Sequence, residues 1–252
     1  MAELSGRIAL VTGGASGIGR ASSLALAREG ANVALTYFSS EKEAREVASE
    51  IEKLGRRALA LEADMTDEAT VERVVAETET KLGPVDILFA NAGGILQRIR
   101  SSEATLDLWN RAFAVNVTST FLVCRAVLRG MEKRKRGAII TMSSLAAFTG
   151  GGPGASHYAA TKGAVATYTR GLAKEVGPLG IRVNGVAPGL IATRFHDQFN
   201  TPEGRASAVA GTPLRREGTS EDVAEAVVYL ASDRSSYLAG EIIQINGGAG
   251  VY

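Results

Sequence analysis

"RIALVTGGASGIGRASSLALAREGANVALTYF" (residues 7–38) decides the fold of this chain. Its opening apolar run leads through a glycine-rich turn into a helical pattern and then into a second run at 32–37. Gly13, Gly17 and Gly19 permit backbone angles barred to other residues, and they let the chain approach a diphosphate at a helix N-terminus. A tight connection without a ligand is the alternative for such a turn alone. Its place at the first strand-to-helix turn favours dinucleotide binding.

The same alternation of short β-branched runs and helix-length segments continues to the end of the chain. This pattern predicts one α/β domain over residues 1–252, in which a parallel sheet is covered by helices on both faces. We expect seven strands, at 7–12, 32–37, 57–63, 85–91, 137–143, 181–188 and 241–246. Several of these runs are apolar without alternation, as in strands that are buried on both faces.

Composition limits the classes of partner. The 252 residues carry a formal net charge of +1, which gives no field that would favour nucleic acid or an anionic membrane. Cys124 is the single cysteine, so an intrachain disulfide is impossible, and the N-terminus lacks the pattern of an export signal. No uninterrupted apolar run approaches the roughly 20 residues that span a bilayer. We therefore expect a cytoplasmic protein with a small-molecule substrate.

The run "SHYAATKGAV" (156–165) places Tyr158 and Lys162 four residues apart, on one face of a helix. A tyrosine titrates near pH 10, but a cation at about 4 Å contributes up to ~4 kcal/mol at an effective dielectric of 20, or about three pKa units. We expect Lys162 to bring the phenol toward working pH in this way. The alternative is an amphipathic helix with a half-buried tyrosine and a snorkelling lysine. His157 points about 100° away from this face and is interpreted as a rim residue.

The fifth strand ends at Ser143 and Ser144, on the carboxyl edge where open α/β sheets bind ligands. A hydroxyl there could bond a carbonyl oxygen while Tyr158 supplies the proton. Hydride transfer from a reduced nicotinamide would then complete a carbonyl reduction or, in reverse, an alcohol oxidation.

With two histidines and one cysteine the usual zinc spacings are absent, so no metal is expected. The chain contains no G-x-S-x-G hydrolase motif either.

The end of the second strand bears on the choice of cofactor. A carboxylate there would bond the ribose 2′-hydroxyl of NAD, but the position holds Tyr37. The hydroxyls of Tyr37, Ser39 and Ser40 could instead donate to a 2′-phosphate. We predict a preference for NADP over NAD, although neither Ser16 nor Phe38 supplies a cation.

Six motifs together resemble those of the short-chain dehydrogenases/reductases. They are "TGGASGIG" (12–19), "NAGG" (91–94), Asn116 in "NVTSTF", Ser144, the pair Tyr158 and Lys162, and "PGLIAT" (188–193). They occur in that family's order and at roughly its spacing over nearly the whole chain. The resemblance implies a Rossmann-type doubly wound sheet with strand order 3-2-1-4-5-6-7. It also implies a homotetramer in which the helices that carry Asn116 and Tyr158 pack across an interface.

The resemblance also implies roles for individual residues. Tyr158 would be the acid/base and Ser144 would orient the substrate. Lys162 would lower the Tyr158 pKa and bond the nicotinamide ribose, while Asn116 would hold a proton-relay water. The cofactor would be bound by Gly13, Ser16, Gly17, Ile18, Gly19, Tyr37, Asp64, Met65, Asn91, Ala92, Gly93, Tyr158, Lys162, Pro188, Gly189, Ile191 and Thr193. The spacing from Ser144 to Tyr158 is one residue longer than usual in the family, so Ser143 remains an alternative; the glycines of 149–155 could absorb the added residue.

A long segment at about 190–217 is expected to form a substrate lid. With the loop at 94–102, it brings four side chains toward the presumed mouth of the site: Arg98, Arg100, Arg194 and His196. These would suit a carboxylate-bearing substrate, although solvated loop cations are an equal alternative.

"TGGGPGA" and "TRFH" locally resemble bacterial reductases of keto-sugar acids from alginate breakdown. The competing substrate is a 3-oxoacyl group on acyl carrier protein. A non-catalytic dinucleotide-binding sensor is the alternative of another class, but it would be expected to lack the tyrosine or the lysine.

Overall fold

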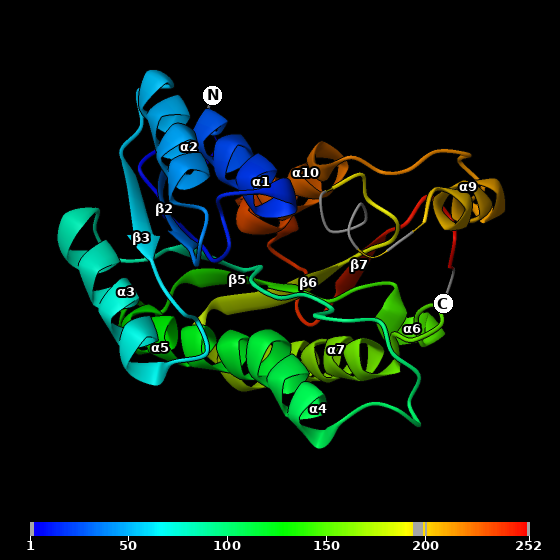
Figure 1. The fold of residues 1–252 in the computed structure, drawn as a ribbon. Helices are drawn as coiled ribbons and strands as arrows, with labels where there is room; N and C mark the ends of the chain where they lie inside the picture. Colours follow the sequence, from blue (N-terminus) through cyan, green and yellow to red (C-terminus); the bar gives the residue numbers. More distant parts are fainter. Residues whose placement is uncertain (1–2, 194–198, 200, 251–252) are drawn as a thin grey trace.

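The computed structural model describes residues 3–193, 199 and 201–250. Seven strands form one parallel sheet in the order β3-β2-β1-β4-β5-β6-β7 (Figure 1). The strands are β1 (Ile8–Val11), β2 (Asn32–Tyr37), β3 (Ala58–Glu62), β4 (Ile87–Ala90), β5 (Gly137–Met142), β6 (Ile181–Pro188) and β7 (Ile242–Ile245). The predicted doubly wound sheet and its strand order are confirmed. Strand ends differ slightly: β4, for example, begins at Ile87 and not at 85.

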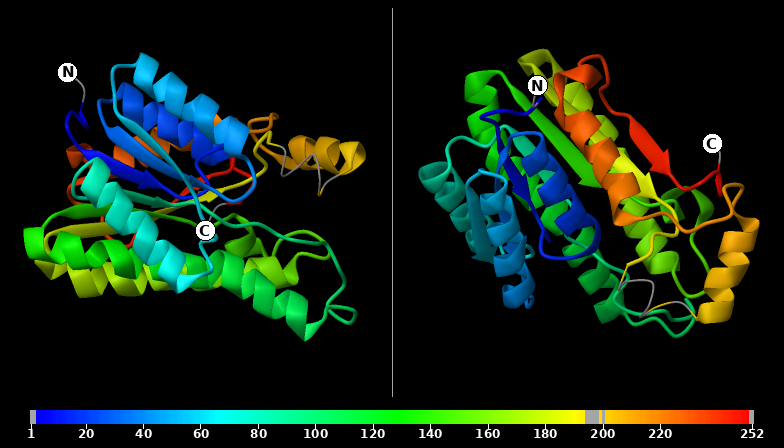
Figure 2. Two further views of the ribbon diagram at one scale, coloured as in Figure 1. Left: turned by 60° about the vertical axis from the view of Figure 1, so that its left-hand side comes forward. Right: turned by 90° about the horizontal axis from the view of Figure 1, so that it is seen from above.

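Helices cover both faces of this sheet. The α-helices of the described residues are α1 (Gly17–Arg28), α2 (Glu41–Lys53), α3 (Glu68–Lys81), α4 (Leu106–Phe113), α5 (Ser119–Arg134), α6 (Ala146–Thr149), α7 (Ser156–Val176), α9 (Pro202–Gly211) and α10 (Ser220–Ala231). Figures 1 and 2 show α1, α2 and α10 on one side of the sheet and α3, α4, α5 and α7 on the other. The short helix α9 stands away from the layered body (Figure 2).

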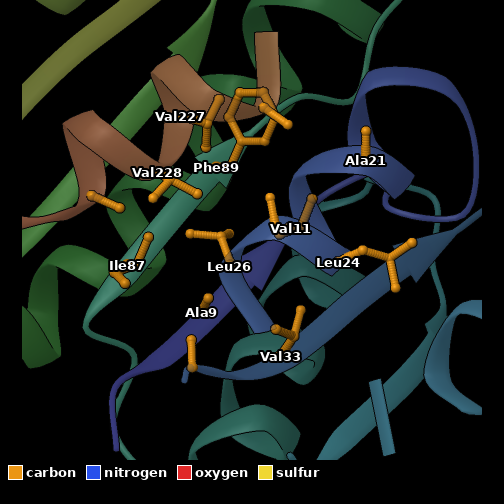
Figure 3. Packing of buried hydrophobic residues seen from close by; sticks show 14 of the residues in the cluster. Ala9, Val11, Ala21, Leu24, Leu26, Val33, Ile87, Phe89, Val227 and Val228 are labelled. Carbon is orange, nitrogen blue, oxygen red and sulfur yellow. The ribbon is translucent and has the colours of Figure 1, made fainter. Parts of the chain in front are cut away.

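The core consists of two layers because each inner strand is apolar on both faces. In β1, Ala9 and Val11 pack under α1, whereas Ile8 and Leu10 face the opposite layer. Figure 3 shows the first layer, where β1 meets α1 and α10. Burial of such side chains stabilises the fold by about 25 cal/mol per Å² of apolar surface removed from water. The unbroken apolar runs of the sequence therefore correspond to the inner strands.

One continuous helical stretch, Leu106–Arg134, corrects an expectation from the sequence. It is 29 residues long, and the mean hydropathy of its most apolar 18-residue window is 1.3, which is enough to cross a membrane by length and composition alone. The stretch contains no uninterrupted apolar run of that length because polar residues are spaced along it. Half of its most apolar window is buried inside the protein, and it packs against β4 and β5. It behaves here as a core helix of the sheet.

The strand order places the site. Strand β1 pairs with β2 on one side and with β4 on the other, so the chain leaves β1 toward one face of the sheet and β4 toward the other. Divergence of this kind opens a crevice at the carboxyl edge of the two strands, where ligands of α/β sheets bind. The glycine-rich turn after β1 and the "NAGG" segment after β4 both lie there.

Candidate active site

Two adjoining cavities occupy the crevice at the carboxyl edge. The first encloses about 320 Å³ and the second about 550 Å³, and both are lined by Gly13, Ala92 and Gly93. Other residues expected at the site line the first cavity: Ser16, Gly17, Ile18, Gly19, Asn91, Ser144, Tyr158, Lys162, Pro188, Gly189, Ile191 and Thr193. Tyr37, Asp64 and Met65 line the second. The structure therefore brings together residues from both halves of the chain.

The turn after β1 is held as an open cradle. Gly13 and Gly17 have φ of +63° and +51°, a region that favours glycine, and α1 begins at Gly17. A Cβ at Gly19 would collide with the Gly13 carbonyl oxygen. The Asn91 amide donates to the carbonyl oxygens of Thr12 (2.9 Å) and Gly13 (3.1 Å). The backbone is thus fixed with the helix N-terminus facing the cavity, which fits a diphosphate.

Thr12 is a supporting residue that the sequence interpretation missed. Its hydroxyl accepts hydrogen bonds from the backbone N–H groups of Asn91 and Ala92, each at 3.0 Å. These bonds tie the end of β4 to the turn after β1. The threonine that opens the "TGG" sequence was the available signal.

Two serines at the end of β5 have different partners. The Ser143 hydroxyl is buried and donates to the Lys162 carbonyl oxygen at 3.0 Å. The Ser144 hydroxyl accepts from the Ala146 N–H at 3.1 Å and forms a hydrogen bond with the Tyr158 phenol. Among the two, Ser144 is therefore the hydroxyl that shares the cleft with Tyr158. In the intervening segment, Gly150, Gly151 and Gly154 all have positive φ.

The electrostatics of the tyrosine–lysine pair differ from the expectation. Lys162 is only 2% exposed, its ammonium donates to the Met142 carbonyl oxygen at 2.8 Å, and Nζ lies 5.7 Å from the Tyr158 ring centroid. Burial lowers the pKa of Lys162 to about 7. Burial also raises the pKa of Tyr158 above its ordinary value, while the Ser144 hydrogen bond acts in the opposite direction. The expected lowering of the phenol pKa by a nearby cation is thus not found in this structure, because desolvation acts on both groups.

The buried lysine leads to a prediction about stability. The folded-state pKa of about 7 lies below the ordinary value of 10.5, so the unfolded chain binds more protons between these pH values. The cost of the buried ammonium is complete below about pH 7 and disappears toward about pH 10. Lys162→Met should therefore raise the free energy of unfolding of the cofactor-free protein by a few kcal/mol at about pH 6, since one pKa unit corresponds to about 1.4 kcal/mol. The gain should shrink as pH rises.

Urea unfolding of both proteins over this pH range provides the measurement. Comparing the two proteins at each pH cancels the titration of other groups. A stability difference that does not change with pH would contradict the assignment of a lowered pKa to Lys162.

Asn116 lies beneath the cleft and not in its lining. It belongs to a π-helical turn, Ala114–Thr118, between α4 and α5, and turns of this kind are frequent at functional sites. Its side-chain amide donates to the Gly94 carbonyl oxygen (2.8 Å), and its Oδ1 accepts from the Gly94 N–H (3.0 Å). This reciprocal pair fixes the "NAGG" segment against the long helix. A Cβ at Gly93 would lie 2.5 Å from Asn116 Oδ1 and 3.3 Å from Lys162 Nζ.

The second cavity is bordered by the end of β2. Tyr37 and the largely exposed Phe38 lie on one side, and Asp64 accepts from the N–H and the hydroxyl of Thr66 at 2.8 and 2.7 Å. Burial, together with the carboxylates of Glu41 and Glu62, raises the pKa of Tyr37. The mixed apolar and polar lining is suited to an adenosine group.

His157 is not a rim residue, contrary to the sequence interpretation. It is 3% exposed, its Nε2 lies 3.0 Å from the Ile95 carbonyl oxygen, and its Nδ1 has no hydrogen-bond partner among the described residues. The loop after β4 folds over the first turn of α7 and covers it. The burial of His157 was not predicted because it comes from a segment about 60 residues away in the chain.

The structure describes two of the four basic side chains that were expected at the mouth of the site. Arg98 is half-buried and its guanidinium donates to the carbonyl oxygens of Phe199 (2.7 Å) and Pro153 (3.0 Å). Arg100 is exposed. Arg194 and His196 lie outside the described residues. Arg98 is therefore engaged by main-chain groups, which weakens the argument for a carboxylate-bearing substrate.

Comparison with known proteins agrees with this geometry. The family described as "Enoyl-(Acyl carrier protein) reductase" matches residues 13–250. The chain is 39% identical to cyclohexanol dehydrogenase of Rhodococcus sp. (strain TK6), covering 97% of this chain and 96% of that protein. It is 38% identical to the 3-oxoacyl-[acyl-carrier-protein] reductase FabG of Escherichia coli (strain K12), covering 96% and 97%.

Among solved structures, 7α-hydroxysteroid dehydrogenase in complex with NADH and 7-oxo glycochenodeoxycholic acid superposes with a TM-score of 0.93. Sequence identity is 34%, and the match covers 98% of this chain and 95% of that one. The glycine cradle, the tyrosine–lysine pair and these similarities over nearly the full length lead to one conclusion. This chain belongs to the short-chain dehydrogenase/reductase family and is an NAD(P)-dependent oxidoreductase.

Proposed function

We propose that the enzyme interconverts a ketone and a secondary alcohol, with Tyr158 as the proton donor and acceptor. The observation that carries the proposal is the meeting of Tyr158, Ser144 and Lys162 in the cleft that the glycine cradle opens. When bound, the nicotinamide dinucleotide supplies or accepts the hydride. Ser144 bonds the carbonyl oxygen of the substrate, and Tyr158 protonates that oxygen as negative charge develops on it.

The raised pKa of Tyr158 suits the reductive direction, because the phenol stays protonated at neutral pH. Oxidation of the alcohol requires the phenolate and should therefore accelerate as pH rises. Lys162 bonds the nicotinamide ribose; hydroxyl acceptors there would favour the ammonium and oppose the desolvation that lowers its pKa. Asn116 contributes by holding the "NAGG" segment and a proton-relay water. The remaining residues of the two cavities bind the dinucleotide.

Preference for NADP over NAD is part of the proposal. Glu41, the carboxylate that follows the end of β2, is bonded by Arg45, which offsets its charge. Ser40 precedes α2 and its hydroxyl makes no capping hydrogen bond, so it is free to donate to a 2′-phosphate. Because the donors are hydroxyls and not cations, we expect NADPH to bind only about fivefold to thirtyfold more tightly than NADH, as for one or two net hydrogen bonds of about 1 kcal/mol each.

Titration of nicotinamide fluorescence measures both dissociation constants without a substrate. The ratio of turnover efficiencies should follow the same order. A lower dissociation constant for NADH would contradict the assignment of the hydroxyls to a 2′-phosphate.

Two substrate classes can be compared directly. A keto-sugar acid fits the local resemblance of the 149–155 and 193–196 segments, and a 3-oxoacyl thioester on acyl carrier protein fits the 38% identity to FabG. Nicotinamide absorbance during incubation with a panel of small keto-uronates, cyclic ketones, secondary alcohols and a 3-oxoacyl thioester tests the proposed reaction and separates these classes. Turnover of no carbonyl and no alcohol in the panel would contradict the proposed reaction.

A cytoplasmic homotetramer completes the proposal. In the layer formed by α4, α5 and α7 (Figure 1), large apolar side chains of α4 and α5 are exposed: Leu106, Trp109 and Phe121. Phe121 and Tyr168 bring an aromatic pair to the same surface, with ring centroids 6.3 Å apart. Large exposed aromatic side chains are typical of surfaces that associate with another protein chain. These features support self-association through the helices that carry Asn116 and Tyr158.

A further inference from the structure

The segment before Tyr158 is joined to a loop far away in the sequence. This loop, 94–102, follows β4, and we call it the substrate loop. Besides the contact of His157 with Ile95, three contacts join the substrate loop to the segment before Tyr158. The Ile99 N–H donates to the Gly154 carbonyl oxygen (3.0 Å), and Arg98 donates to the Pro153 carbonyl oxygen (3.0 Å). The hydroxyls of Ser101 and Ser156 lie 2.7 Å apart. The position of the first turn of α7 is therefore coupled to the substrate loop.

Gly154 makes this close approach possible. Its φ is +74°, and a Cβ there would lie 2.9 Å from the Ile99 nitrogen and 3.4 Å from Arg98 Cβ. Leu96, near the start of the same loop, also has a positive φ, of 63°. A non-glycine residue keeps such a conformation only where its surroundings determine it. The substrate loop is thus held in one shape by the segment that precedes Tyr158.

Arg98 also contacts a third segment. Its Nε donates to the Phe199 carbonyl oxygen at 2.7 Å, and Phe199 precedes α9. Figure 2 shows the loop after β4 running along the end of the molecule that carries α9. A planar guanidinium can bond two carbonyl oxygens in fixed directions at once, which an ammonium does much less well. One side chain therefore joins the substrate loop, whose Gly94 lines the first cavity, to Pro153 and Phe199 from two other segments.

We propose that Arg98 is a positioning residue for the reaction, and not a ligand of a substrate carboxylate. Its guanidinium holds the segment before Tyr158 and Phe199 against the substrate loop, so that the substrate meets the loop and the first turn of α7 as a preformed wall. The expected effect of Arg98 on turnover rests on the proposed function. The contacts of Arg98 with Pro153 and Phe199 do not depend on that function. A misplaced wall affects substrate binding and orientation, while the dinucleotide cradle after β1 is untouched.

The test compares Arg98→Ala, Arg98→Lys and the matched control Arg100→Ala. Arg100 lies in the same loop, is exposed, and its side chain makes no hydrogen bond or ion pair among the described residues. Both alanine variants remove one positive charge from the same loop. Only Arg98→Ala removes the contacts with Pro153 and Phe199.

The first readout is amide hydrogen exchange in the full chain with NADPH present. Arg98→Ala should speed exchange by about tenfold or more in residues 149–157 and 201–211, Arg98→Lys by less, and Arg100→Ala not at all. If either segment of Arg98→Ala exchanges its amide hydrogens at the wild-type rate, the proposal is overturned. Equal acceleration by Arg100→Ala would also overturn it, because charge and not geometry would then be responsible. If Arg98→Ala fails to fold, the Arg98→Lys arm decides by the same criteria.

The second readout is kinetic, with NADPH and the carbonyl of the panel that the wild type reduces fastest. Arg98→Ala should raise KM and lower kcat, for a loss of about tenfold or more in kcat/KM, and leave the NADPH dissociation constant within about twofold. A matching rise of KM in Arg100→Ala that disappears in high salt would instead identify charge attraction of an anionic substrate and overturn the positioning role. If the wild type reduces no carbonyl, the proposed function fails, whereas the exchange measurement still decides the role of Arg98.

Discussion

Tyr158→Phe should reduce turnover by about 10²–10⁴-fold, the usual contribution of a positioned general acid. The substitution removes one oxygen atom from a side chain that shares the cleft with Ser144 and Lys162. The ammonium of Lys162, which also lines this cleft, is bonded to the Met142 carbonyl oxygen, so the developing alkoxide would depend on water for its proton. The phenyl ring fills the same volume, which preserves the lining of the cleft. The NADPH dissociation constant should therefore stay within about twofold.

Tyr168→Phe provides a matched control. Tyr168 lies on the same helix, α7, but packs against Phe121 and away from the cleft. It loses the same hydroxyl group, so any general effect on the stability of α7 should be seen in both variants. Steady-state rates and a nicotinamide binding titration on the two proteins provide the comparison. Substantial wild-type turnover in Tyr158→Phe would show that another group donates the proton.

Gly93→Ala should lower kcat/KM by about 10²-fold or more and weaken cofactor binding as well. A Cβ at this position would lie 2.5 Å from Asn116 Oδ1, closer than side chains tolerate, and 3.3 Å from Lys162 Nζ. Asn116 cannot move aside freely because its amide and its Oδ1 are both bonded to Gly94. The added methyl group must therefore break that pair or displace the lysine. The backbone at Gly93 does not have a positive φ, so the effect would come from the contact alone.

Gly94→Ala is the control for this substitution. It adds the same methyl group one residue later, where nothing lies within 4 Å of the new Cβ. We expect a much smaller loss of activity, and near-native thermal stability in both variants. Kinetics and cofactor titrations measured side by side distinguish them. Equal losses in the two variants would show that the loop is sensitive to any side chain, and that the Asn116 contact is not the cause.

Local patterns were sufficient for the sheet and for part of the site. The apolar runs and glycines of 7–38 predicted β1, the turn and α1, since turn geometry and strand burial are encoded within a few residues. The four-residue spacing of Tyr158 and Lys162 placed both on one face of α7 in the same way. Ser144 was preferred to Ser143 only by resemblance; the structure adds that the Ser143 hydroxyl bonds the Lys162 carbonyl oxygen.

The misses within the site concern contacts between distant segments. His157 is covered by Ile95, and Arg98 is bonded to Pro153 and Phe199, partners that no spacing along the chain reveals. The lowering expected for the pKa of Tyr158 was wrong for the same reason. The phenol was considered beside the charge of Lys162 alone, whereas burial in the assembled cleft dominates for both groups.

The amino-acid sequence by itself determined the parallel sheet, the cradle after β1 and the helical face that carries Tyr158 and Lys162, because each depends on periodicity and backbone preference within one short segment. Only the tertiary structure decided how those groups are solvated and which loops are joined near them. Desolvation and hydrogen bonding depend on atoms brought together from all parts of the chain, so the charge state of Lys162 and the partners of Arg98 exist only once the segments are packed.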